Sequence, residues 1–177
     1  DARLKASRPE DFADQRNFRS LLIYGMSGGN PVTLDHVLAK LALDDDQKRL
    51  ASGVLNYVNG RPMAARAALG PVDPLKADNE IGAFIALVKG SIAANDEPPA
   101  AAHALDQAIL LGPGTLVEEA ALRRRIAVAT DLGESTRFLD ASDDYVRRYL
   151  RSPYASQFAD AFVSGIVALH KKLDREQ

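Results

Sequence analysis

The chain of 177 residues contains no cysteine and no tryptophan, and aromatic residues make up only 6% of it. The lack of cysteine excludes disulfides, thiolate zinc sites and cysteine nucleophiles, although it does not identify a cellular compartment. β-Branched residues form only short runs, so the potential for β-sheet is poor. No stretch approaches the roughly 18 uncharged apolar residues of a membrane-spanning helix. We therefore expect an α-helical chain without a membrane span.

A dominant charge of one sign is also lacking, because 22 basic and 24 acidic residues give a formal net charge of −2. A protein that binds nucleic acid needs a clustered positive field to displace counterions. The one dense basic run, Arg123–Arg125, follows two glutamates inside a helical pattern and is typical of a solvated helix flank. We expect no nucleic-acid partner.

Hydrophobic residues make up 46% of the sequence, and much of this fraction is alanine, the residue with the highest helix propensity. Apolar residues recur at spacings of three and four between glycine and proline turns, which indicates amphipathic helices. The expected helices span about 12–26, about 31–42, the segment from Asp44–Asp46 to Gly60, 62–69, about 75–94, 100–111, 115–132, a segment carrying Phe138 to Tyr149, and a last one from about 154.

Several helix ends carry their own signals. Gly28 and Gly29 close one helix, and Asn30 caps the next with proline at its first position. Thr115 and Glu118 have the spacing of a capping box, in which Glu118 reaches back to the N–H of the cap residue.

Helices joined by short turns predict an all-α fold of consecutive antiparallel hairpins, in a single domain over 1–177. Residues 1–11 are expected to be a poorly ordered or truncated lead-in. Gly90, Ala102, Ile109 and Pro113 have spacings close to those of a tetratricopeptide (TPR) repeat, so 85–153 is the most TPR-like part. A TPR-like solenoid is the leading prediction, and an irregular helical bundle is the alternative.

Candidate catalytic, cofactor and metal sites fail on spacing. His36, His103 and His170 stand alone, without a partner at ligand spacing. Three consecutive aspartates at 44–46 cannot form a calcium loop, which needs ligands at alternating positions and a central glycine. We expect no metal and no cofactor.

Two further patterns also fail. Glu118 and Glu119 differ by about 100° around a helix, so they cannot face each other to share a proton. Ser27–Asn30 lacks the lysine and the glycine spacing of a phosphate-binding loop. The sequence therefore predicts a protein that is not an enzyme.

What remains is a group of tyrosines and arginines around one helix–turn–helix. These side-chain types are enriched at binding hot spots. The candidate partner-binding residues are Tyr145, Arg147, Arg148, Tyr149, Arg151 and Tyr154. In the alternative interpretation, the tyrosines belong to the core and the arginines balance a helix C-terminus.

Three segments resemble the MotC family of periplasmic motility proteins that accompany the flagellar motor in a subset of bacteria. They are LLIYGMSGGNPVTL (21–34), GPGTLVEEAALRRR (112–125) and RRYLRSPYASQFADAFV (147–163). The resemblance implies a non-enzymatic accessory of the stator, exported with a signal peptide that is cleaved upstream of Asp1. Its implied partner is the periplasmic region of MotB, the stator subunit that anchors to peptidoglycan. A generic TPR-like adaptor unrelated to motility is the alternative function.

Overall fold

The computed structural model of the chain describes residues 1–176, without the side chains of Asn79 and of residues 171–176. Within this part the chain forms ten α-helices and two 3-10 helices (η) and no strand, which confirms the all-α class. The elements are α1 (Ala2–Lys5), η1 (Pro9–Phe12), α2 (Gln15–Met26), α3 (Pro31–Leu38), α4 (Asp45–Val58), α5 (Pro62–Leu69), η2 (Pro74–Lys76), α6 (Asn79–Ala93), α7 (Pro98–Leu111), α8 (Leu116–Leu132), α9 (Ser135–Tyr149) and α10 (Ala155–Glu176).

Most helix ends follow the caps in the sequence. The Asn30 side chain accepts from the backbone N–H groups of Val32 and Thr33 at 2.9 and 3.3 Å. Two helices begin later than predicted because aspartates cap them. Asp14 starts α2 and Asp78 starts α6, while the residues just before each form a short 3-10 helix. Residues 1–11 contribute α1 and most of η1, and α1 lies against α3.

The capping box predicted at α8 is only half present. Thr115 Oγ1 accepts from the backbone N–H of Glu118 at 3.4 Å, as expected. The Glu118 carboxylate accepts instead from the N–H of Gly114 at 2.6 Å, because the N–H of Thr115 already donates to the carbonyl of Gly112. The turn before α8 is therefore held by the hydrogen bonds of Gly114 and Gly112 in place of the second bond of a capping box.

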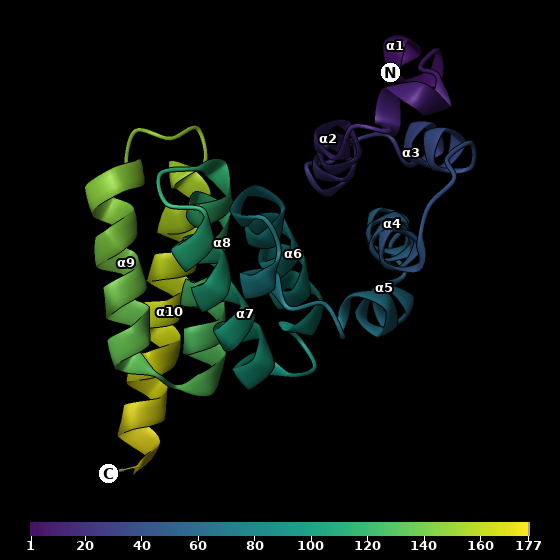
Figure 1. Cartoon of the computed structure of the whole chain (residues 1–177). Helices are drawn as coiled ribbons and strands as arrows, with labels where there is room; N and C mark the ends of the chain where they lie inside the picture. The colour runs from purple at the N-terminus through teal and green to yellow at the C-terminus, as the bar shows by residue number, and fades with distance from the viewer. Residues whose placement is uncertain (177) are drawn as a thin grey trace.

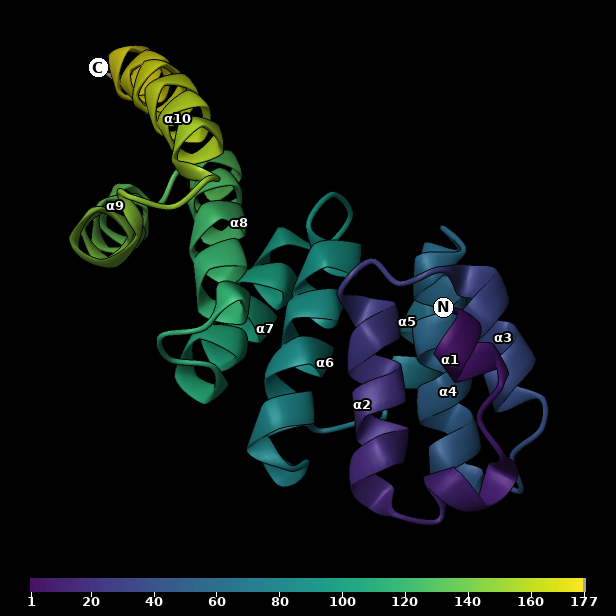
Figure 2. The same cartoon turned by 90° about the horizontal axis from the view of Figure 1, so that it is seen from above.

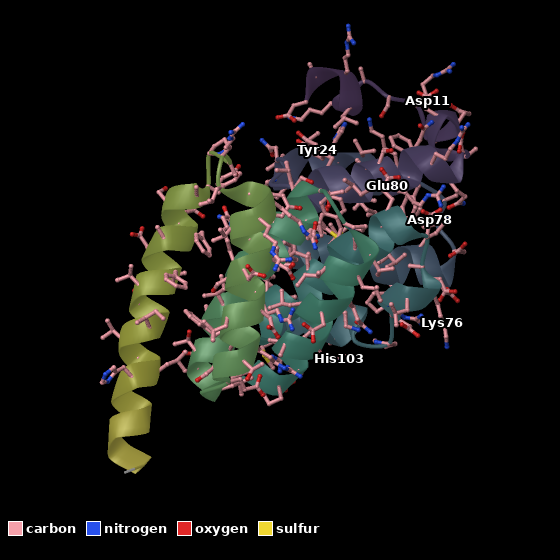
Figure 3. The ribbon with its side chains drawn as sticks, turned by 90° about the vertical axis from the view of Figure 1, so that its left-hand side faces the viewer. Asp11, Tyr24, Lys76, Asp78, Glu80 and His103 are labelled. Atoms are coloured by element: carbon pink, nitrogen blue, oxygen red, sulfur yellow. The ribbon has the colours of Figure 1, made fainter. Side chains whose placement is uncertain are left out.

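Consecutive helices pack on one another along α6, α7, α8 and α9, and α10 packs chiefly on α8 (Figure 1). The N-terminal elements are arranged differently. Figure 2 shows α2 between α4 and α6, so it contacts a helix that follows four helices later in the chain. An ion pair between Arg19 of α2 and Asp78, which lies beside α2 in Figure 3, joins this contact. The arrangement fits a helical bundle, and the TPR-like solenoid is not confirmed.

Three clusters of buried apolar residues form the core, one in α2–α6, one in α6–α8 and one in α8–α10. The middle cluster consists largely of alanines, which let helices approach closely. A Cβ added to Gly90 of α6 would come within 2.8 Å of the Leu105 side chain on α7. The C-terminal cluster is aromatic, with the rings of Tyr145 and Phe158 stacked at 4.2 Å between centroids. These clusters fix the positions of α9 and α10, where the predicted binding residues lie.

Candidate partner-binding surfaces

The six residues predicted to bind a partner all lie near the turn between α9 and α10, but at different depths. Tyr145 is fully buried (0% exposed) in the C-terminal core cluster. Its hydroxyl donates to Glu119 Oε1 at 2.8 Å. Burial, together with this hydrogen bond and the charge of Glu119, raises the pKa of Tyr145 to about 12. Tyr145 therefore holds α9 on α8 from the inside.

Tyr149 and Arg148 converge on the second buried glutamate, Glu118, whose exposure is only 1%. The Tyr149 hydroxyl donates to Glu118 Oε2 at 2.6 Å, and the Arg148 guanidinium forms an ion pair with the same carboxylate. Burial and the Glu118 carboxylate raise the pKa of Tyr149. With the N–H of Gly114 as a further donor, Glu118 is well satisfied, as a buried charge must be.

The remaining predicted residues face solvent. Arg147 forms an ion pair with Asp143 at 2.6 Å one turn earlier, and Arg151 is exposed in the turn. Tyr154 is 42% exposed, and the guanidinium of Arg123 lies 4.7 Å from its ring centroid. This distance is within the range of a cation–π contact.

An exposed apolar residue that sequence reasoning overlooked belongs to the same surface. Leu150 is 56% exposed between Tyr149 and Arg151. In the sequence, its position at the end of a helix, between a tyrosine and an arginine, could have indicated that it belongs to this surface. We call this surface the α9–α10 corner, which consists of Arg147, Arg148, Leu150, Arg151 and Tyr154. It combines cationic, aromatic and apolar groups within one turn.

A second candidate surface is a hollow that we call the α5–α7 cleft. It has a volume of about 630 Å³ and is bordered by α5, residues 70–75, α6 and α7. The ammonium of Lys89 lines it and donates to the carbonyls of Gly70 and Val72 at 3.2 and 2.8 Å. Burial lowers the pKa of Lys89. The signal in the sequence was that Lys89 is the one charged residue between Glu80 and Asp96.

The candidate ligands rejected from the sequence lie apart. His36 is exposed on α3, and His103 is exposed on α7, where Gln107 is its hydrogen-bond neighbour (Figure 3). Across the described residues, no group of three or more histidine, aspartate or glutamate side chains is placed to hold a metal ion. The Asp44 side chain accepts from the N–H of Gln47 and so caps α4.

The adjacent glutamates do not act together either. The Glu118 side chain bonds to Gly114, Arg148 and Tyr149, whereas the Glu119 side chain bonds to Tyr145. Both carboxylates are shielded from solvent and therefore from any substrate. None of the helices in the described part of the chain has the length and apolar character needed to cross a membrane.

Comparison with known proteins gives a consistent result. A family model described as "Chemotaxis protein MotC" matches residues 1–177. The chemotaxis protein MotC of Rhizobium meliloti (strain 1021) is 38% identical over 168 residues, which are 95% of this chain and 39% of that protein. The chain thus spans about two fifths of the length of this curated relative. No solved structure matches the chain.

Proposed function

The chain belongs to the MotC family of chemotaxis proteins, and on this premise we propose that it is a non-enzymatic periplasmic accessory of the flagellar motor that binds the stator protein MotB. The observation that carries the proposal is the family match over the whole chain. The membership confirms the resemblance of the three segments at 21–34, 112–125 and 147–163. Membership of this family makes the chain a motility-associated protein. The binding of MotB, the periplasmic location and the support of flagellar rotation are our proposals.

The form of the molecule supports binding rather than catalysis. The two glutamates inside the core, Glu118 and Glu119, are engaged in hydrogen bonds between α8 and α9. The hairpins of α6 to α9 present long helical surfaces of the kind that TPR-like proteins use to hold a segment of a partner. We therefore propose that α6 to α9 bind a partner in the manner of TPR-like helical hairpins.

Within this function, we assign a contact with the partner to the α9–α10 corner. Arg147, Arg148, Arg151 and Tyr154 offer exposed cationic and aromatic groups that can bury area against a partner. Tyr145 and Tyr149 contribute indirectly, because their hydrogen bonds to Glu119 and Glu118 hold α9 against α8.

The test is a calorimetric titration of the chain with the purified periplasmic region of MotB from the same organism. The double variant Arg151→Glu with Tyr154→Ala should bind at least about tenfold more weakly, as expected for hot-spot residues. Arg61→Glu is the matched control, since Arg61 is exposed and directly precedes α5, a helix that lies across the molecule from α9 in Figure 1, and it undergoes the same charge change. Its affinity should stay within about twofold.

Because the chain spans part of its relative, the titration is repeated with full-length MotC of Rhizobium meliloti and its own MotB. No binding by either protein would contradict the proposal. Deletion of the gene should reduce spreading in soft agar. Unchanged swimming together with a cytoplasmic location would instead favour the generic TPR-like adaptor.

A further inference from the structure

The α5–α7 cleft is a hollow with an apolar lining and an open side. Its volume of about 630 Å³ falls within the range of ligand-binding pockets. Val72 and Ile92 line it at partial exposure, and Leu75 at its rim is 50% exposed. A small molecule is usually enclosed over most of its surface, whereas an open cleft suits a chain segment that enters and leaves.

One wall of the cleft is fixed in place. Residues 70–74 include two prolines, which restrict the backbone of this loop. Lys89 on α6 donates to two carbonyls of the loop, those of Gly70 and Val72. A wall that is already ordered loses little conformational entropy when a partner binds.

Of the two cations that line the cleft, Lys89 has donor capacity left, whereas Arg66 is engaged by carboxylates. Arg66 pairs with Glu97 through Nη1 at 2.8 Å, and its buried Nη2 lies 3.8 Å from Asp96 Oδ2. The Lys89 ammonium has three donors and uses two of them on carbonyls. Asp73, which also lines the cleft, accepts from the N–H of Leu75 at 3.0 Å.

We propose that the α5–α7 cleft binds a segment of the partner protein in which an aspartate or glutamate stands between apolar residues. The apolar residues would cover Val72, Leu75 and Ile92, and the carboxylate would accept from the remaining donor of Lys89. This inference rests on the proposed function, since it supplies the chemistry of the segment by which MotB would be held.

This site is separate from the α9–α10 corner. The turn between α9 and α10 lies at the upper left of Figure 1, and α5 and the adjoining end of α7 lie towards the lower right. Mutations at the two sites are therefore expected to have additive effects on the free energy of binding. Each site can be tested without disturbing the other.

The experiment titrates the same purified periplasmic region of MotB into cleft variants of the whole chain. Lys89→Gln removes the cation, and Leu75→Glu places a charge on the apolar rim without touching the contacts of Lys89. We expect both variants to weaken binding at least about tenfold. The matched control is Leu110→Glu, because Leu110 is 69% exposed on α7 outside the cleft, and its affinity should stay within twofold of the unmodified chain.

The outcomes separate the two proposals. If the unmodified chain does not bind, the proposed function fails and this inference fails with it. If the unmodified chain binds and both cleft variants bind equally well, this inference alone is overturned. Circular dichroism of each variant checks that the fold is retained, and Leu75→Glu remains informative if Lys89→Gln loosens the loop.

A second readout tests the chemistry of the segment. Overlapping synthetic peptides that cover the periplasmic region of MotB are measured against the chain by fluorescence anisotropy. The peptide that binds should lose at least about tenfold in affinity when its aspartate or glutamate becomes asparagine or glutamine. Equal binding by the amide peptide, or equal binding to the Leu75→Glu variant, would overturn the assignment.

Discussion

At the scale of single residues, two tyrosine–glutamate pairs join α8 to α9. Tyr145 donates to Glu119 and Tyr149 donates to Glu118, and both carboxylates are almost completely buried. A buried carboxylate that loses its donor retains the full cost of leaving water, so each pair matters more for stability than an exposed hydrogen bond does. Two of the predicted partner-binding residues, Tyr145 and Tyr149, thus form the hydrogen bonds that hold the α9–α10 corner in place.

We predict that Tyr145→Phe destabilises the fold by about 1–3 kcal/mol at pH 7, because Glu119 loses its donor. The folded chain keeps the pKa of Tyr145 at about 12, above the unfolded value of about 10. The stability from this group is therefore complete below pH 10 and is lost as the pH rises from 10 to 12. Urea unfolding at pH 7, 10 and 12 should show a smaller alkaline loss in the variant.

The control for this measurement is Tyr154→Phe, since Tyr154 is 42% exposed and loses no buried partner. Its free energy of unfolding should change by no more than about 0.5 kcal/mol. An alkaline loss of stability that is the same in Tyr145→Phe as in the unmodified chain would contradict the role given to the Tyr145 hydroxyl.

At the scale of elements, side chains from aspartate, asparagine and threonine determine where most helices start. Asn30, Asp44 and Thr115 were predicted as caps or as acidic starts and are observed as such. Asp14 and Asp78 also cap helices, but the apolar pattern ran on into the 3-10 segments before them. A 3-10 turn and the first turn of an α-helix place apolar residues at similar spacings, so periodicity alone could not separate them.

We predict that Asn30→Ala lowers the free energy of unfolding by about 1 kcal/mol, because the side-chain oxygen caps two N–H groups of α3. Asn30→Gly should cost only a few tenths of a kcal/mol, since glycine at this position lets water solvate the same groups. Thermal unfolding monitored by circular dichroism ranks the two variants. Equal losses in both would show that the cap is not the source of the stability.

At the scale of the whole molecule, three core clusters follow one another from α2 to α10 and share helices at their borders. α6 contributes to the first and second clusters, and α8 contributes to the second and third. This sharing connects the N-terminal elements to the α9–α10 corner through a series of packed helices. It also places the two candidate surfaces on one connected core.

We predict that core substitutions in the first and third clusters have additive effects. Leu34→Ala in α3 should cost about 2–5 kcal/mol and Ile126→Val in α8 about 0.5–1.5 kcal/mol, because both side chains are fully buried. Their double variant should equal the sum within about 0.5 kcal/mol, since the two sites share no cluster. Urea unfolding measures all three variants, and a larger coupling energy would mean that the clusters are not independent.

The sequence by itself determined the α-helices from α2 to α10, most of their caps and the family to which the chain belongs. These features are local, because helix hydrogen bonds and caps involve residues within four positions of each other. It also placed Tyr145, Arg148 and Tyr149 together near one turn. It left open whether the tyrosines are core or surface, and it missed Leu150 and Lys89.

Only the tertiary structure decided those questions, because they depend on contacts between distant parts of the chain. The burial of Tyr145 requires α8 to supply Glu119, which lies 26 positions earlier. The contact of α2 with α6 and the shape of the α5–α7 cleft likewise depend on how whole helices pack. Packing is set by the joint fit of many side chains, so no local pattern in the sequence specifies it.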